Sequence, residues 1–328
     1  MLIGDAPLYY KNASIAKKGA AYWVNTTDKV KVRIGLWKGS DLENTSHGTV
    51  FIFPGRTEYI EKYGKTAEIF VQLGYSALAI DWRGQGLADR SLPDRMMGDV
   101  TDFTEYQKDL DAVIETSENL ELPKPWFLLA HSMGGCIAQR ALHRDLAFVS
   151  AAFTGPMWGI VIQNVLLRPF AQTIAKTAKM LSLAANYAPN VTKDCYCATA
   201  KFEGNTLTRD PDMWAYMRNQ VLQTPELQLG GPSIRWFEAA LRETNDLAGM
   251  PSPKQASLCY LGDNEQIVSK SRIIKRMKSW SNGRLINVPN AEHEILMMHE
   301  NIQNQIVSEI SDFYQNTITA STEVEKII

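Results

Sequence analysis

Cysteine, net charge and long hydrophobic runs are all scarce in this sequence. A formal net charge of −2 and a pI of about 6.2 leave no basic excess, so we expect no nucleic-acid partner. The most apolar window, residues 157–167, is interrupted by Gln163 and Asn164 and is too short to span a bilayer. No basic segment followed by a long apolar one opens the chain. We therefore expect no secretory signal and a cytoplasmic location.

The four cysteines point to neither disulfides nor a metal site. Cys136 and Cys259 lie in apolar stretches, which is typical of buried free thiols. Cys195 and Cys197 lack the second pair that a zinc site needs. This usage fits a reducing compartment, and we expect neither a metal nor an organic cofactor.

Hydrophobic residues are plentiful, at 45% of the chain, and they follow two different periods. In residues 30–37 apolar and polar side chains alternate after a turn at Thr27-Asp28, which predicts the second strand of an antiparallel hairpin. Continuous apolar runs follow, and such runs are typical of strands covered on both faces, as in a parallel sheet. These runs are residues 49–53, 76–80, 126–130, 148–153, 256–261 and 284–288.

Apolar residues at helical spacing fill the gaps between the runs, at residues 59–73, 103–120 and 295–313. Strands that alternate with helices predict right-handed crossovers. The expected fold class is therefore α/β, with a mostly parallel, doubly wound sheet that carries an N-terminal antiparallel hairpin.

The alternation breaks at residues 156–231, a segment longer than a connection needs. We interpret it as a helical cap inserted over the strand ends. The core then consists of residues 1–155 and 232–316. The polar segment 317–328 shows no packing pattern and is expected to fray.

A short apolar run leads directly into Ala130-His131-Ser132-Met133-Gly134, and a helical pattern follows at once. A strand, a sharp turn and a helix would leave the Ser132 hydroxyl exposed at the end of a sheet, as in a nucleophile elbow. A serine hydroxyl needs a base and an acid behind it to become a good nucleophile. The sequence therefore predicts that Ser132 is a catalytic nucleophile with partners elsewhere in the chain.

Among the five histidines, His293 is the expected general base. It follows the last apolar run after a short turn, which places it at the same sheet edge as Ser132, where open α/β sheets build their sites. His47 lies in a polar loop, and His131 is expected to point away from its serine neighbour. His143 and His299 lie on predicted helices and are expected to be surface or packing residues.

The loop after residues 256–261 offers two carboxylates to orient this histidine, Asp263 and Glu265. Position alone leaves the choice between them open. Either acid, placed between Ser132 and His293 in the chain, gives the order serine, acid, histidine that belongs to α/β hydrolases. The serine, the acid loop and the histidine each fall at a predicted strand end, in this chain order. Such a match to the hydrolase pattern is much less probable by chance than a match of the serine turn alone.

Two backbone N–H groups are expected to hold the oxyanion that forms during acyl transfer. The first is that of Met133, at the start of the helix after Ser132. The second should come from residues 54–58; Pro54 has no N–H, and the predicted donor is Arg56. Residues 81–86 lack the spacing of a dinucleotide fingerprint and are interpreted as a structural loop beneath the serine edge.

These segments resemble the α/β-hydrolase superfamily and, more narrowly, the bacterial monoacylglycerol lipase and lysophospholipase group. The resemblance runs from about Tyr22 to Tyr314, is weakest in the cap, and rests on residues 51–59, 81–86, 130–135, 265–268 and 290–295.

The resemblance implies Ser132 as nucleophile, His293 as base, Glu265 rather than Asp263 as acid, and Met133 and Arg56 as oxyanion donors. The chain departs from the group's pattern at three positions. Ala130 replaces a glycine, Pro54 replaces a histidine, and the acid is more often aspartate. The change at Pro54 alters the hydrogen bonding behind the oxyanion loop.

The predicted cap is rich in apolar side chains, which could hold an acyl chain, although most must pack the cap against the core. They are Trp158, Ile160, Val161, Ile162, Val165, Leu166, Leu167, Phe170, Met180, Leu181 and Leu183. Arg168, Lys176 and Lys179 could face an anionic headgroup or the inner face of a membrane, but a solvated helix face is favoured.

We expect hydrolysis of a carboxylic ester with one acyl chain, such as a monoacylglycerol or lysophospholipid. The expected partner is this small acyl ester, and the sequence indicates no obligate protein partner. The alternatives are acyl transfer or amide, lactone or thioester hydrolysis by the same residues. A further alternative is a non-catalytic ligand-binding protein on the same fold.

Overall fold

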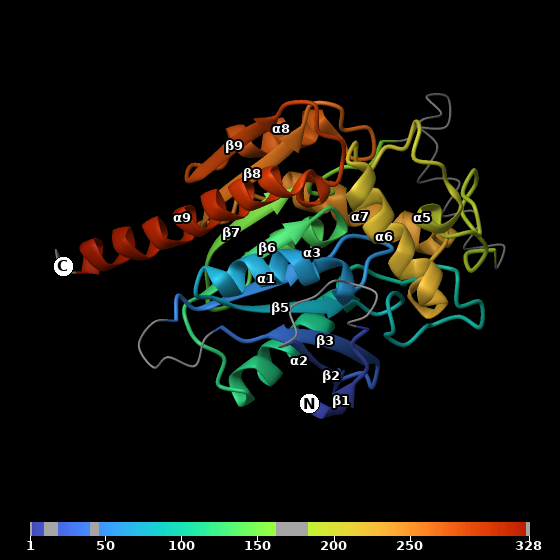
Figure 1. Ribbon diagram of the computed structural model, residues 1–328, viewed down its shortest axis with the longest axis horizontal. Helices are drawn as coiled ribbons and strands as arrows, with labels where there is room; N and C mark the ends of the chain where they lie inside the picture. Colours follow the sequence, from blue (N-terminus) through green and yellow to red (C-terminus); the bar gives the residue numbers. More distant parts are fainter. Residues whose placement is uncertain (1, 10–18, 40–45, 162–182, 326–328) are drawn as a thin grey trace.

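The computed structural model describes residues 2–9, 19–39, 46–161 and 183–325. A nine-stranded sheet runs through the molecule in the order β1-β2-β3-β5-β4-β6-β7-β8-β9 (Figure 1). The pairs from β5 through β9 are parallel, and β1, β2 and β3 continue the sheet antiparallel beyond β5. The strands are β1 (Leu2–Ala6), β2 (Gly19–Asn25), β3 (Lys31–Trp37), β4 (Thr49–Phe53), β5 (Ser76–Asp81), β6 (Trp126–His131), β7 (Phe148–Thr154), β8 (Ala256–Gly262) and β9 (Gly283–Val288).

Helices cover both faces of the sheet, which explains the continuous apolar runs in its strands. In β4, Phe51 and Phe53 belong to one buried apolar cluster, whereas Val50 and Ile52 belong to the other. The first cluster includes residues of α2 (Glu105–Asn119), α3 (Met133–Ala141), α7 (Ile234–Gly249) and α8 (Lys270–Lys278). The second includes residues of α1 (Gly64–Gln72), α6 (Pro211–Gln223) and α9 (Glu300–Glu325). The predicted doubly wound α/β sheet is confirmed.

The chain end differs from the expected frayed tail, because α9 continues as a helix to Glu325. Ile306, Ile310 and Tyr314 are buried, and the Tyr314 hydroxyl donates to the Leu128 carbonyl over 2.6 Å. Thr317 Oγ1 lies 3.0 Å from Ser150 Oγ. A helix that packing has already formed gains one hydrogen bond per added residue, so it extends beyond its buried face.

The segment between β7 and α7 holds α5 (Tyr196–Thr199), α6 and the 3-10 turn Pro225–Leu227. Within residues 156–161 and 183–231 the structure assigns no strand, only isolated bridges. Trp158 packs into the core against Phe153 and Trp280, and Leu183 is exposed. Other cap residues named above lie outside the described residues: Ile162, Val165, Leu166, Leu167, Arg168, Phe170, Lys176, Lys179, Met180 and Leu181.

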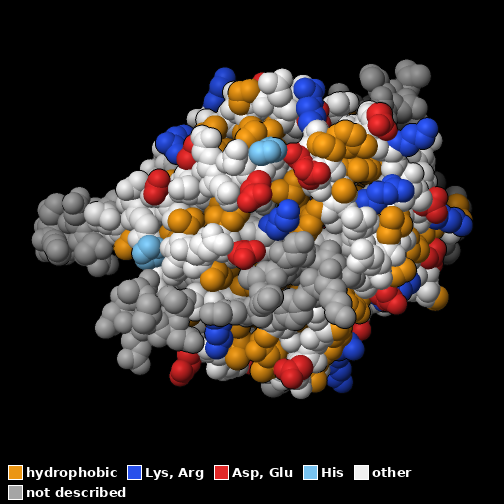
Figure 2. Space-filling model, in the orientation of Figure 1, with side chains coloured by type: hydrophobic (Ala, Val, Ile, Leu, Met, Phe, Trp, Pro, Cys, Tyr) orange, Lys and Arg blue, Asp and Glu red, His pale blue; other side chains and the backbone are white. Residues whose placement is uncertain are grey.

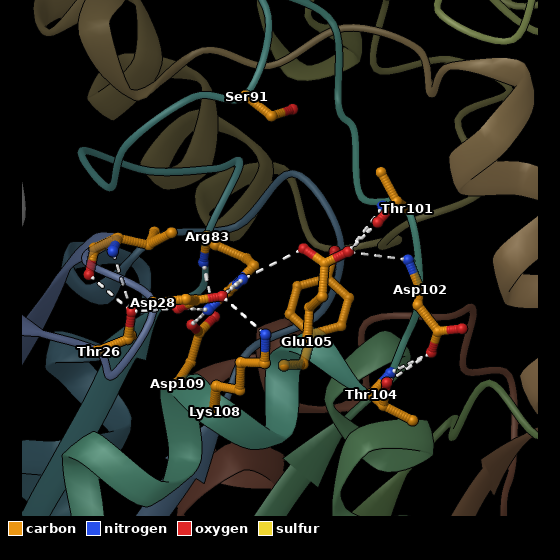
Figure 3. Close-up of polar contacts among 12 residues, drawn as sticks. Thr26, Asp28, Arg83, Ser91, Thr101, Asp102, Thr104, Glu105, Lys108 and Asp109 are labelled. Carbon is orange, nitrogen blue, oxygen red and sulfur yellow. Dashed lines mark hydrogen bonds and ion pairs between the residues drawn. The ribbon is translucent and has the colours of Figure 1, made fainter.

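Arg83 fastens the loop after β5 to two other parts of the core (Figure 3). Its guanidinium pairs with Asp109 on α2 at 2.7 Å and with Asp28, in the turn between β2 and β3, at 2.9 Å. Glu105 lies 3.2 Å from the same side chain. These contacts hold the loop in place and support the interpretation of residues 81–86 as structural.

Acidic and basic side chains are interspersed among the described residues on the face drawn in Figure 2, as the small net charge predicts. Across the described ranges, no helix combines the length and the apolarity that a bilayer crossing requires.

Candidate active site

Ser132 forms the turn between β6 and α3 with a backbone that L-residues seldom adopt, at φ +48° and ψ −116°. A conformation of this kind costs about 1–3 kcal/mol and persists only where surrounding contacts hold it. Here Ser132 N donates to the Thr154 carbonyl over 3.1 Å, and the Ser132 carbonyl accepts from Met157 N over 2.8 Å. A Cβ at Gly134 would lie 2.0 Å from the Phe53 carbonyl oxygen, so only glycine lets α3 begin this close to β4.

His293 lies in the loop after β9, and the carboxylate that contacts it belongs to Glu265. His293 Nδ1 is 2.6 Å from Glu265 Oε2. The other oxygen, Glu265 Oε1, accepts hydrogen bonds from Ile267 N at 2.6 Å and Val268 N at 3.0 Å. Asp263 is exposed to solvent. Of the two acids that the sequence offered, the structure therefore brings Glu265 to the histidine.

The pKa of Glu265 lies below its usual value although its side chain is buried. Burial alone would raise this pKa, but the charge and hydrogen bond of His293 outweigh it, assisted by the two backbone donors. Glu265 is therefore a carboxylate at neutral pH, as a residue that orients an imidazole must be.

The end of β7 joins Ser132 to the His293–Glu265 pair. Thr154 accepts the Ser132 N–H, and a Cβ at the next residue, Gly155, would lie 3.2 Å from both Glu265 Oε2 and His293 Nδ1. Among the described residues, Ser132 Oγ and His293 share no direct hydrogen bond. Bonds of this kind are often long without substrate and tighten when it binds.

The two predicted oxyanion donors flank Ser132. The Met133 N–H is the first of α3 and has no acceptor inside the helix. A Cβ at Gly55 would come within 3.1 Å of Ser132 Cβ, so the loop that carries Arg56 runs directly beside the serine. Trp82 Nε1 donates to the Pro54 carbonyl over 3.1 Å, and Gln85 Nε2 donates to the Gly55 carbonyl over 2.7 Å. The loop after β5 thus holds the predicted oxyanion loop in place.

Sequence reasoning missed a buried group of four charged or titratable side chains behind His293. This group, called the buried quartet below, consists of Glu58, Lys62, His131 and Glu294. Lys62 Nζ bonds Glu58 Oε1 and lies 2.6 Å from Glu294 Oε1. His131 Nδ1 lies 2.9 Å from the Thr154 carbonyl oxygen, which can only accept, so this nitrogen carries a proton.

The quartet reaches the candidate site through its histidine. His131 Nε2 lies 3.4 Å from Glu294 Oε2, and the rings of His131 and His293 are 4.7 Å apart between centroids. The Glu-x-x-x-Lys spacing of Glu58 and Lys62 and the adjacency of Glu294 to His293 were visible in the sequence. Neither feature shows that the two segments meet.

The charges of the quartet stabilise one another. Burial alone would lower the pKa of Lys62, but Glu294 and Glu58 raise it above its usual value. Burial would likewise lower the pKa of His131, which the same two carboxylates raise. Burial alone would raise the pKa of Glu294, and Lys62 and His131 hold it well below its usual value.

The quartet does not fit a metal ion. The ligand atoms of Glu58, His131 and Glu294 lie within 4.8 Å of one another, which would suit an ion. However, the Lys62 ammonium already bonds both carboxylates. The chain supplies its own cation at this place.

Comparison with known proteins agrees with this architecture. Residues 44–300 match the family described as serine aminopeptidase, S33. Lysophospholipase L2 of Escherichia coli K12 is 29% identical over 283 residues, covering 81% of this chain and 79% of that protein. A probable lysophospholipase L2 of Haemophilus influenzae is 27% identical over 273 residues, covering 83% and 85%.

Among solved structures, a soluble variant of monoglyceride lipase from Saccharomyces cerevisiae superposes with a TM-score of 0.68. The two sequences are 17% identical, and the alignment covers 90% of this chain and 94% of the yeast chain. At that identity the likeness shows the fold alone. The fold and the family match over residues 44–300 together show that this chain belongs to the S33 family of the α/β-hydrolase superfamily.

Proposed function

We propose that this protein is a serine hydrolase that cleaves carboxylic esters of single-acyl-chain lipids, such as monoacylglycerols or lysophospholipids. The observation that carries the proposal is the 2.6 Å contact between His293 and Glu265 at the sheet edge that also presents the strained Ser132 turn. Relatives named lysophospholipase, and a neighbour in structure named monoglyceride lipase, support this substrate class.

In the proposed mechanism Ser132 Oγ attacks the ester carbonyl while His293 takes its proton. Glu265 holds the imidazole in the required tautomer and stabilises its charged form. The N–H groups of Met133 and Arg56 bind the oxyanion. His293 then protonates the leaving alcohol, and a water molecule activated by the same histidine releases the acid from the acyl-enzyme.

The expected contact with a membrane surface stays a prediction, because Arg168, Lys176 and Lys179 lie outside the described residues. The cytoplasmic location stays a prediction as well.

The test is a panel of p-nitrophenyl esters of increasing chain length, with a monoacylglycerol and a lysophospholipid of one acyl length. Ser132→Ala should abolish turnover, whereas Ser281→Ala, at an exposed turn before β9, is the matched control. Activity near that of the wild type in Ser132→Ala would reject the mechanism. Product analysis with a competing alcohol would separate hydrolysis from acyl transfer.

A further inference from the structure

The side chain of Arg56 is a deeply placed cation with few partners among the described residues. Its Nη2 donates to the Gly230 carbonyl, and its guanidinium carbon lies 5.2 Å from the centre of the Trp236 ring. Its Nε is enclosed and has no hydrogen-bond partner among the described residues. Burial lowers the pKa of Arg56 to about 10, which leaves the group cationic at neutral pH.

The other buried arginines among the described residues are satisfied, either by carboxylates or by several carbonyls. Arg33 pairs with both Glu61 and Asp81. Arg276, which contacts no carboxylate among the described residues, still donates to Met250 O, Leu247 O and Ser252 Oγ. Arg56, with one acceptor among the described residues, differs from both kinds.

The cap residues outside the described ranges include no acidic side chain that could pair with Arg56. Residues 162–182 contain no aspartate or glutamate, and none of the described carboxylates forms an ion pair with Arg56. Part of the Arg56 surface nevertheless remains accessible to solvent although its Nε is enclosed. A deeply placed cation that pairs with no carboxylate among the described residues is suited to an anionic ligand that enters from outside.

The position of Arg56 indicates which kind of anionic ligand it would bind. Its backbone N–H is the proposed oxyanion donor, so its side chain starts beside the place where the scissile carbonyl would bind. In a lysophospholipid only a glycerol unit separates the ester from the phosphate. We propose that the Arg56 guanidinium binds the phosphate in the leaving group of the substrate and so selects lysophospholipids over neutral monoacylglycerols.

This inference rests on the proposed ester hydrolase and names its specificity residue. A planar guanidinium can bind two phosphate oxygens at once, and the Trp236 face would hold its plane. Its free N–H groups would gain charge-assisted hydrogen bonds, for which we expect an affinity advantage of about 10- to 100-fold.

The test uses ether lipids that the enzyme cannot hydrolyse. Calorimetry would compare the binding of 1-O-octylglycerol with that of its 3-phosphocholine and 3-phosphoglycerol derivatives, below their micelle concentrations. The wild type should bind both phosphate-bearing ethers about 10- to 100-fold more tightly than the neutral ether. If both derivatives show the preference, the tighter binding is due to the phosphate and not to the choline.

Arg56→Met should reduce this ratio to near one. Arg56→Lys should keep only part of the binding ratio, because an ammonium is a point charge and lacks the planar set of N–H donors of a guanidinium. Arg218→Met removes a cap arginine that donates to the carbonyls of Cys197 and Ala200, and should keep the full ratio.

Equal or absent binding of the ethers by the wild type would overturn the inference. An undiminished ratio in Arg56→Met would do so too. If Arg56→Met does not fold, an undiminished ratio in Arg56→Lys has the same force. Failure of the proposed function would show separately, as ester turnover that survives Ser132→Ala.

Discussion

Two charged regions lie close to Gly55, and they differ in how their charge is satisfied. In the buried quartet, Lys62 is shared by two carboxylates and His131 completes the group. Arg56, by contrast, has a single carbonyl acceptor among the described residues. Because the charges of the quartet pair with one another, the quartet can be understood as a structural support for the loops that carry Arg56 and His293. Arg56 has no such partner among the described residues, which points to a ligand that the fold does not provide.

The largest effect on stability is expected from breaking the quartet at its cation. Lys62→Met removes the ammonium that both Glu58 and Glu294 bond and leaves His131 as their remaining counter-charge, which should lower the free energy of unfolding by about 3–5 kcal/mol. Urea denaturation measures this loss. Lys65→Met is the matched control, because Lys65 is a half-buried lysine of the same segment that lies over the Tyr216 ring and forms no ion pair among the described residues. A loss below about 1 kcal/mol would show that the quartet is not held by its charges.

A second buried pair, the Glu265 carboxylate and the His293 imidazole, should affect turnover. Glu265→Gln keeps the shape but removes the charge that stabilises the imidazolium, and kcat should fall by about 100-fold or more. Asp263→Asn, two residues earlier and exposed, should leave kcat within about twofold. A variant pair in which only Asp263→Asn is impaired would reverse the assignment.

A smaller, pH-dependent effect is expected from His131. Its pKa is raised in the folded protein, so its contribution to stability is fully present below its unfolded pKa of about 6.5 and is lost as the pH rises through the folded value. The stability difference between the wild type and His131→Asn should therefore shrink at alkaline pH. Denaturation at several pH values measures it, and a difference that grows with pH would contradict the assigned charge.

The smallest effect on stability is expected at Arg56. Because the guanidinium satisfies few partners, Arg56→Met should change the free energy of unfolding by no more than about 1 kcal/mol, in either direction. Measured beside Lys62→Met, this value tests the comparison directly. A loss as large as that of Lys62→Met would make Arg56 a structural residue.

Much of the fold could be predicted because hydrophobic periodicity is a local property. The run 49–53 is β4 itself, since a strand buried on both faces needs apolar residues at every position. The continuation of α9 beyond Thr317 could not be predicted, because a helix end that extends past the core carries no apolar pattern. For the site, the turn at Ser132 and the chain order that leads to His293 were visible, since a sharp turn needs small residues at fixed offsets.

The sequence by itself determined the parallel sheet, the elbow at Ser132 and the placing of an acid loop and a histidine at strand ends. The family resemblance favoured Glu265 over Asp263, but only the tertiary structure brought Glu265 to His293 and Lys62 to Glu294, and left Arg56 with no carboxylate among the described residues. The physical reason is range. Periodicity acts between neighbours along the chain, whereas a charge is satisfied by whichever residue the fold brings within a few ångströms, however distant in sequence.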